Sequence, residues 1–244
     1  MKSILAAVQF LTILPVWIKT DERNLGRSIP WFPLAGLCIG AGAALVYGCA
    51  IRLNVPVMGS AVLGIAVLAI LSGGLHLDGL ADSADGLFSH RSRERILEIM
   101  RDSRIGTMGV LALFFVLAMK TAALAAMVPS LAVRALMLAP VAARAAVSLS
   151  LVIFPYARLE GGLAGAFMEY RKRIDVFLPI VMALLAGWLC LELDGIVVVL
   201  ACLLVGTGFS IWCRYRLGGI TGDTLGAVSE ITETLSLLVA SVLL

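Results

Sequence analysis

Charged side chains are scarce in this sequence. Aspartate, glutamate, lysine and arginine together make up 14% of its 244 residues, whereas apolar residue types make up 61%. A water-soluble domain of this size usually has about a quarter of its residues charged and about half apolar. The apolar excess is too large for one water-soluble core. It excludes a soluble binding module and predicts a chain embedded in a lipid bilayer.

Features that would indicate other classes of protein are also missing. The five cysteines form no Cys-x-x-Cys pair, so the sequence predicts neither a zinc site nor a disulfide framework. The net charge is only +3, and the basic residues lie in short stretches between apolar runs, which argues against nucleic acid as a partner. No internal repeat or low-complexity tract is visible, so we expect a single domain over residues 1–244.

Seven apolar runs have the length, about 20 residues, that a membrane-spanning helix needs. They cover residues 31–51, 56–75, 107–128, 131–154, 176–193, 195–213 and 224–244. An eighth run at 4–18 is interrupted by Pro15 and Trp17, and no signal-peptide cleavage site follows it. We interpret it as a retained interfacial or re-entrant helix, although a crossing of the membrane stays open. The predicted fold is an all-α, polytopic membrane helical bundle of about seven transmembrane helices.

Basic residues alternate between the two ends of these runs. Lysines and arginines gather at 19–27, 91–104, 158–173 and 214–216, whereas the turns near 54, 129 and 194 have few. Loops rich in lysine and arginine usually stay in the cytoplasm. We therefore predict a multi-pass protein of a bacterial inner membrane with these four stretches on the cytoplasmic side. The polar segments 76–106, 155–174 and 214–223 then share that face, where we expect the active site.

The stretch GLHLDGLADSADG, residues 74–86, has three aspartates at helical spacing. Asp78, Asp82 and Asp85 are four and three residues apart, so they share one face of a helix. Carboxylates so close to a bilayer repel one another, and a hard divalent cation removes the repulsion. We predict that they bind Mg²⁺ or Mn²⁺ together with phosphate. The alternative is a polar loop whose acidic side chains face water.

Residues near these aspartates extend the predicted site. In MRDSRIGTMG, residues 100–109, Arg101 and Arg104 could clamp phosphoryl oxygens, and Asp102 could orient them or join the metal ligands. His76 could be a general base or a phosphate contact, or only a polar interfacial residue. The arginines between residues 91 and 95 are better explained by topology and lipid headgroups, on a helix that lies at the interface.

A second glycine-rich acidic stretch, GITGDTLGA at residues 219–227, precedes the last apolar run. Gly222 allows close backbone approach, and the free N–H groups at a helix start favour anions. We expect Gly222 to bind substrate and Asp223 to be a metal ligand. A helix N-cap at Thr221 or Asp223 is the alternative.

Some charged residues fall inside the apolar runs themselves. Glu230 lies seven residues after Asp223 and would be costly in lipid, so we expect it to line the same cavity as the aspartates and to bind substrate. Lys120, Arg134 and Arg144 either snorkel to the interface or pair with Glu230 or Glu233. Arg144 is the deepest of the three in its run, and we expect it to have a buried acidic or phosphate partner.

The three polar motifs resemble the hallmark stretches of the cobalamin synthase family, the adenosylcobinamide-GDP ribazoletransferases. They occur in the family's order with no departure at their acidic positions, and FLTILP (10–15) and WFPLAG (31–36) resemble its N-terminal stretches. The resemblance covers nearly the whole chain. It implies a Mg²⁺-dependent membrane transferase that completes the nucleotide loop of cobalamin. A ribose hydroxyl of α-ribazole, or of its 5′-phosphate, displaces GMP from adenosylcobinamide-GDP in that reaction.

The residues alone lead only to metal-assisted phosphate chemistry at the cytoplasmic face. Our mechanistic hypothesis is direct in-line transfer, in which the arginines add positive charge and one aspartate or His76 accepts the hydroxyl's proton. The predicted metal ligands are Asp78, Asp82, Asp85 and Asp223. Two alternatives stay open: a membrane phosphotransferase for a nucleotide-activated lipid, and, less favoured, a cation-coupled transporter. The sequence does not fix the oligomeric state, and a homo-oligomer is compatible with it.

Overall fold

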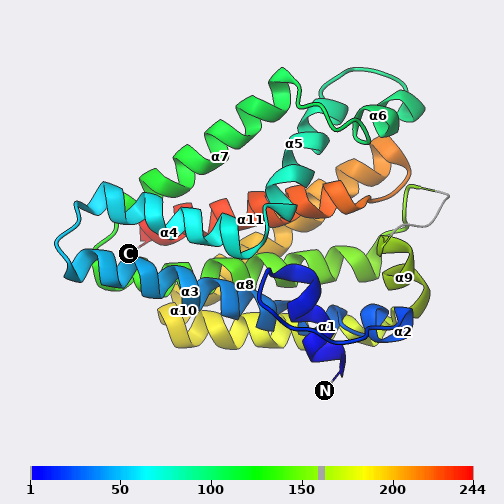
Figure 1. The fold of residues 1–244 in the computed structure, drawn as a ribbon. Coiled ribbons are helices and arrows are strands. Elements are labelled where there is room, and N and C mark those ends of the chain that lie inside the picture. The colour runs from blue at the N-terminus through cyan, green and yellow to red at the C-terminus, as the bar shows by residue number, and fades with distance from the viewer. Residues whose placement is uncertain (1, 159–162, 244) are drawn as a thin grey trace.

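A computed structural model describes residues 2–158 and 163–243. Its described part is a bundle of helices without a β-strand, which confirms the predicted all-α fold class (Figure 1). The helices are α1 (Lys2–Leu11), α2 (Glu22–Gly26), η1 (Ile29–Trp31), α3 (Phe32–Arg52), α4 (Val57–Leu71), α5 (Leu75–Leu87), α6 (Arg93–Ile99), α7 (Thr107–Ala126), α8 (Pro129–Ile153), α9 (Leu163–Tyr170), η2 (Arg173–Val176), α10 (Phe177–Leu217) and α11 (Gly222–Leu243).

Most of the long helices are apolar enough to cross a membrane. In the described part of the chain, five helical stretches meet this requirement, and the bent pair α4 and α5 raises the number to six if it is one span. The protein is therefore a multi-pass membrane protein, whereas the count of about seven spans stays a prediction. The five stretches are Ile29–Arg52, Thr107–Ala126, Pro129–Ile153, Arg173–Leu217 and Gly222–Leu243.

Helix α10 covers both apolar runs predicted at 176–193 and 195–213. The chain reverses direction between these two runs. Helical geometry is interrupted at Leu191 and Glu192. On either side of the break the backbones of Gly187 and Gly195 touch: a Cβ added to Gly195 would lie 2.0 Å from the carbonyl oxygen of Gly187. Residues eight apart in a straight helix are about 12 Å apart. The two halves of α10, yellow and orange in Figure 1, therefore run antiparallel.

We expect Gly187→Ala to destabilise this hairpin. The added Cβ would lie 2.6 Å from the carbonyl oxygen of Gly195, and overpacking of this kind costs about 1–3 kcal/mol. The matched control is Gly208→Ala in the same helix, where an added Cβ meets no atom within 4 Å and alanine favours the helix by about 1 kcal/mol. Thermal unfolding in detergent compares the two. Equal melting temperatures would contradict the close hairpin.

Helix α8 lies at the centre of the bundle, and α3, α10 and α11 pack around it. Glycines allow α3 to approach it closely: a Cβ added to Gly36 or Gly40 would lie 2.4 Å from the carbonyl oxygen of Pro140 or 2.7 Å from that of Leu136. Small residues at helix interfaces are typical of membrane proteins, where van der Waals packing drives association. Arg144 lies in the most deeply buried part of α8, so it needs partners within the bundle.

A pair of glycines sets the position of α5. Helix α4 ends at Leu71 after 15 residues, about 22 Å, which is short of the roughly 30 Å of a bilayer core. Gly73 and Gly74 both have positive φ, +63° and +71°, a conformation that is costly for other residues. Helix α5 then departs at 88° to α4. It therefore begins part-way along the bundle and runs across the direction of α4 toward α6, which lies at the right-hand end of the bundle in Figure 1.

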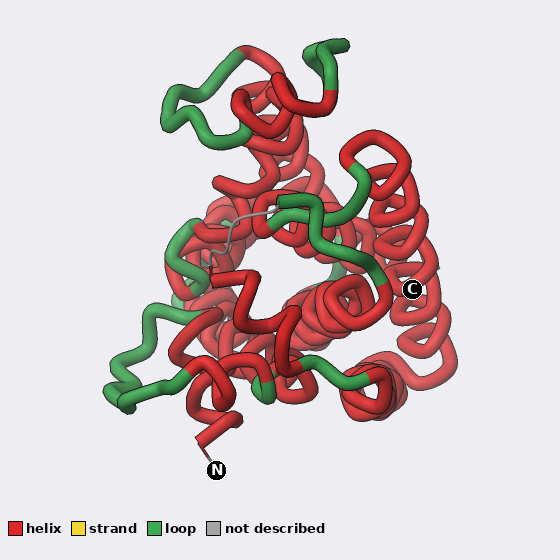
Figure 2. Tube along the Cα trace, turned by 90° about the vertical axis from the view of Figure 1, so that its right-hand side faces the viewer, coloured by secondary structure: helices red, strands yellow, loops and turns green. Residues whose placement is uncertain are grey.

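Short helices gather at that end, which faces the viewer in Figure 2. Helix α1 has only 10 residues, too few to cross a membrane, and its last residue, Leu11, is buried against the bundle. The helix predicted in the run at 4–18 therefore ends at Leu11, and residues 12–18 are not helical. Helix α6 buries Ile96 and exposes its arginines, as predicted for a helix at the interface.

A candidate active site between α5 and α11

The two acidic motifs meet in space through their glycines. A Cβ added to Gly79 of α5 would lie 2.7 Å from the carbonyl oxygen of Asp223, at the start of α11. One added to Gly226 would lie 3.0 Å from the carbonyl oxygen of His76. The glycines thus bring the backbones of α5 and α11 into contact. The structure therefore places the aspartates of residues 78–85 and Asp223 at the same end of the bundle, as predicted.

Asp78 lies near two other predicted metal ligands, because it lines one cavity with Asp82 and another with Asp223. Asp78 is exposed, and Asp82 and Asp223 are half-buried. Asp82 is repelled by Asp78 and Asp223, and Arg158 is the cation that offsets this repulsion. The carboxylates are thus close enough for their charges to interact, and a positive ligand between them is electrostatically favoured.

Asp85 has partners of its own. Its carboxylate accepts a hydrogen bond from the backbone N–H of Gly106 at 2.6 Å and another from that of Gly109 at 2.9 Å. These N–H groups lie at the start of α7, where a helix leaves its first donors unpaired and favours negative charge. Asp85 therefore fastens α5 to α7. Each of its oxygen atoms accepts one hydrogen bond and keeps a second lone pair, so the metal-ligand role of Asp85 stays a prediction.

Arg158 is a site residue that sequence reasoning missed. The chain after α8 runs beside the end of α10: Ala157 N–H donates to the Ile220 carbonyl at 2.8 Å. This pairing places Arg158 against Asp223, with Nη2 and Oδ2 2.5 Å apart. The Nε of Arg158 is buried, and no described residue accepts a hydrogen bond from it. In the sequence Arg158 looks like any other arginine of a basic loop, so only the contact between the two segments identifies it.

Two cavities adjoin at Leu75 and Asp78. The smaller, about 310 Å³, lies between α1, α3, α5, α8, α9 and α11, and its lining includes Phe10, Phe32, Tyr156, Phe167, His76, Arg158, Gly222 and Asp223. The larger, about 730 Å³ and more open, lies between α5 and the segment before α7, and its lining includes Asp82, Arg101 and Asp102. Asp78 thus faces both spaces. Gly222 lines the smaller cavity, and its contact with substrate stays a prediction.

The predicted arginine clamp lies at the larger cavity. Arg101 lines it, whereas Arg104 is exposed and holds Asp102 through a 2.7 Å ion pair. The hydrogen bond from the Arg104 side chain lowers the pKa of Asp102 to about 2, so Asp102 stays ionised at physiological pH. This pair fits the orienting role predicted for Asp102.

A buried network of charges lies behind the aspartates. Lys120 on α7 contacts Glu230 at 2.6 Å and Glu233 at 2.7 Å, and Arg144 on α8 contacts Glu233 at 2.5 Å. The acidic partner expected for Arg144 is therefore Glu233. Glu230 does not line the small cavity, contrary to expectation, because its carboxylate faces Lys120. Two cations and two carboxylates balance one another, which lowers the cost of burying them.

Arg144 also fixes the hydrogen-bonding state of His76. Its Nη2 lies 3.3 Å from His76 Nδ1. A guanidinium can only donate, so Nδ1 accepts and the neutral imidazole has its hydrogen on Nε2. His76 lines the small cavity, where it can donate a hydrogen bond. This geometry favours a donor over the general base that the sequence also suggested.

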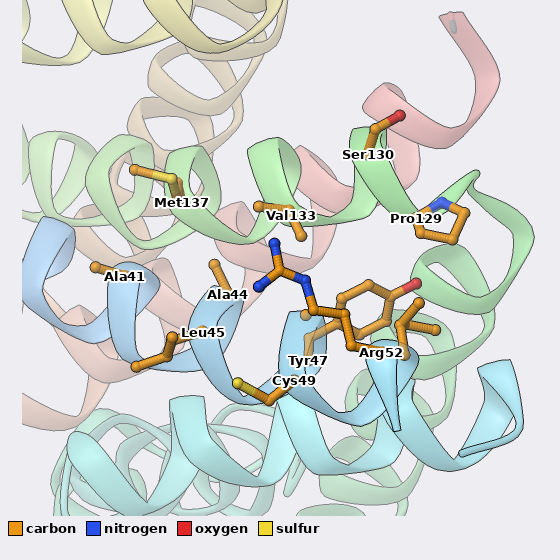
Figure 3. A pocket seen from close by; sticks show the side chains of 12 residues that line it. Ala41, Ala44, Leu45, Tyr47, Cys49, Arg52, Pro129, Ser130, Val133 and Met137 are labelled. Carbon is orange, nitrogen blue, oxygen red and sulfur yellow. The ribbon is translucent and has the colours of Figure 1, made fainter. Parts of the chain in front are cut away.

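A third hollow lies near the opposite end, between α3 and α8 (Figure 3). It measures about 530 Å³, and its lining includes Arg52, Tyr47 and Ser130 but none of the carboxylates that the structure describes. A hard metal ion that assists phosphate transfer needs carboxylate oxygen atoms as ligands. The candidate site is therefore at the end where α5 meets α11.

The donor set fits a metal that binds together with substrate. Among the described residues, no three histidine, cysteine or carboxylate side chains are placed to hold a metal by themselves. Mg²⁺, however, is usually held by one or two carboxylates and by substrate phosphates. Asp78, Asp82 and Asp223 offer such oxygens beside Arg101 and Arg158. The residues thus fit Mg²⁺ bound to a diphosphate better than a permanently held ion.

The fold and the site define a class: a polytopic membrane protein with carboxylates and arginines gathered around adjoining cavities at one end. Comparison with known proteins is more specific. The family model for cobalamin-5-phosphate synthase matches residues 3–241, so the chain belongs to that family.

Curated relatives agree along nearly the whole chain. The adenosylcobinamide-GDP ribazoletransferase of Clostridium novyi is 36% identical over 242 residues, which cover 98% of this chain and 96% of that one. The protein of the same name from Desulforamulus reducens is 42% identical over 241 residues, 95% of this chain and 93% of the other. No solved structure matches the chain.

Proposed function

We propose that this protein catalyses the last assembly step of the cobalamin nucleotide loop. It transfers the adenosylcobinamide phosphate moiety of adenosylcobinamide-GDP to α-ribazole, or to its 5′-phosphate, and releases GMP. The relatives that bear the name of this reaction support the proposal. The structural observation that carries it is the position of Asp78, which lines two adjoining cavities, the smaller of them together with Asp223. Joining two large substrates requires two binding spaces that meet at the reacting atoms.

The proposed reaction is a direct displacement at phosphorus. A ribose hydroxyl oxygen bonds to the phosphorus that is attached to cobinamide, the bond from that phosphorus to the bridging oxygen breaks, and GMP leaves with the bridging oxygen. Mg²⁺ on the diphosphate would stabilise the charge that develops on the phosphoryl oxygens and on the leaving group. Asp78, Asp82 and Asp223 are the residues that would hold it.

The remaining roles belong to the arginines and to one carboxylate. Arg101 lines the larger cavity, Arg158 lines the smaller one, and both would supply positive charge for the diphosphate. The ion pair with Asp223 holds the guanidinium of Arg158 in place before substrate binds, and within the described part of the chain its Nε has no acceptor. One aspartate accepts the hydroxyl's proton. A trapped phosphorylated protein would contradict direct transfer.

We also propose that the site faces the cytoplasm of a bacterial cell. The arginines of residues 91–104 and Arg158 lie at the same end as the aspartates, whereas the opposite end has fewer basic residues. Positive residues favour the cytoplasmic side of an inner membrane. Soluble nucleotide substrates reach the site directly from that side.

We expect the purified protein in lipid nanodiscs to release GMP only when adenosylcobinamide-GDP, α-ribazole and Mg²⁺ are all present. Chromatography of the nucleotide products measures this, and chelation of the metal should stop it. Release of nucleotide from an activated lipid, without reaction of the corrinoid, would support the alternative phosphotransferase instead. Cation uptake into vesicles without GMP release would support the transporter.

A further inference from the structure

We propose that the smaller cavity binds the aromatic base of the nucleoside substrate, and that His76 donates a hydrogen bond to the base's unsubstituted ring nitrogen. This inference rests on the proposed function, because it assigns one of the two substrates of that reaction to a place. The base of α-ribazole is a dimethylbenzimidazole. It is flat and apolar, and apart from the nitrogen bonded to ribose it has a single polar atom, a nitrogen with a free lone pair.

The lining of the small cavity suits a flat apolar ring. Phe10, Phe32 and Phe167 come from three different helices and form one cluster, with ring centroids 5.0 to 6.4 Å apart. All three line the cavity, together with Val147 and Leu151 of α8. Aromatic rings at such distances favour a further ring that stacks or meets them edge-on. The volume of about 310 Å³ is at the lower end of the range of small-molecule sites.

The polar groups of this cavity lie where the sugar and the reacting hydroxyl would be. The small cavity is also lined by Asp78, Arg158, Gly222 and Asp223, and Asp78 lines the larger cavity too. A nucleoside bound with its base against the phenylalanines therefore directs its ribose toward the aspartates. The larger cavity is open and charged, which suits the corrinoid and its diphosphate and does not suit a small apolar base.

The tautomer of His76 makes the recognition specific. Arg144 occupies Nδ1, so the hydrogen is on Nε2. No described protein atom accepts a hydrogen bond from Nε2, and His76 lines the cavity. Nε2 is not among the buried atoms without a partner, so water can reach it through the cavity. A ligand that displaces this water without bringing an acceptor leaves the donor unpaired, so a ligand with an acceptor is preferred. The free ring nitrogen of a benzimidazole is an acceptor of this kind.

The first test measures nucleoside binding alone. Titration of the full-length protein in nanodiscs with α-ribazole, followed by its intrinsic fluorescence, should give a Kd that rises about fivefold or more in Phe10→Ala, because stacking area is lost. Phe10 is half-buried on the short helix α1 and packs against Phe32 and Phe167 of the core, so the melting temperature of the variant is measured beside the Kd. The matched control is Phe209→Ala, which removes a half-buried ring stacked on Trp212, away from the cavity. Equal effects of the two variants would overturn the cavity assignment.

The second test examines the hydrogen bond through the ligand. An indole riboside, in which C–H replaces the free ring nitrogen, should bind wild-type protein roughly 5- to 100-fold more weakly than α-ribazole, because the donor stays unpaired. In His76→Phe the two ligands should bind within about threefold of each other, since no donor remains. An unchanged ratio in this variant would show that His76 does not contact the base. The ratio compares two ligands on one protein, so it does not depend on how stable the variant is.

The outcomes separate this inference from the proposed function. If wild-type protein releases GMP but nucleoside binding is insensitive to Phe10 and His76, only the cavity assignment fails. If wild-type protein neither binds α-ribazole nor releases GMP, the proposed function itself fails. Binding of adenosylcobinamide-GDP provides the internal control, and its Kd should be unchanged in Phe10→Ala.

Discussion

Asp78→Asn is expected to reduce the rate of GMP release by about 10²- to 10⁴-fold while the protein still inserts and folds. Asp78 lies where the two cavities adjoin, so its carboxylate is the one best placed to face both substrates and the metal between them. Asparagine keeps the size of the side chain and removes the charge. Metal-assisted charge stabilisation is worth several kcal/mol, and each 1.36 kcal/mol is tenfold in rate.

Two control variants sharpen this prediction. Asp194→Asn changes an acidic residue in the reversal of α10, at the opposite end, and should leave turnover within about twofold of wild type, as is usual for surface substitutions. Asp85→Asn should lower thermal stability, because an amide has one acceptor oxygen for the two N–H groups of Gly106 and Gly109. In Asp78→Asn the Mg²⁺ concentration for half-maximal rate should also rise. Wild-type turnover and wild-type Mg²⁺ dependence together would remove Asp78 from the site.

The membrane spans and the acidic face of α5 could be predicted from sequence because both are local patterns. Apolar runs of about 20 residues and a spacing of four and three between aspartates depend only on helix geometry. The run at 56–75 was extended too far for the same reason: apolar side chains continue to Leu75, but Gly73 and Gly74 turn the backbone before it. Glycine in an apolar run gives no periodic signal, so the 88° bend was not foreseen.

The pairing of charges could not be predicted, because it depends on which helices are neighbours. Asp85 looks like the other aspartates of α5, yet α7 begins beside it and uses its carboxylate. Glu230 shares a helix face with Asp223, yet Lys120 of α7 reaches it first. Arg158 gained its role from the contact of two loops. Spacing in the sequence identified the charged residues that could bind metal or phosphate. Tertiary contacts determine which of these side chains are instead paired with other residues.

The buried network leads to the second large prediction, a loss of stability in Glu233→Gln. Glu233 contacts both Arg144 and Lys120, and all three side chains are at most 3% exposed. Removing one partner of a buried ion pair typically costs about 3–5 kcal/mol, because an uncompensated charge stays in the interior. Glu98→Gln removes an exposed pair with Arg95 and should change stability little. Thermal unfolding in nanodiscs compares them, and a wild-type melting temperature for Glu233→Gln would contradict the network.

A double variant separates charge balance from the positioning of His76. Arg144→Met combined with Glu233→Gln leaves Lys120 and Glu230 as a neutral pair, so most of the lost stability should return. The hydrogen bond that holds His76 Nδ1 is then absent, and the imidazole is free to exchange its tautomer. The double variant should therefore be stable yet bind α-ribazole more weakly and discriminate less against the indole riboside. If the double variant recovered both its stability and its discrimination between the two ligands, His76 would keep its tautomer without Arg144. The charge network would then have only a structural role.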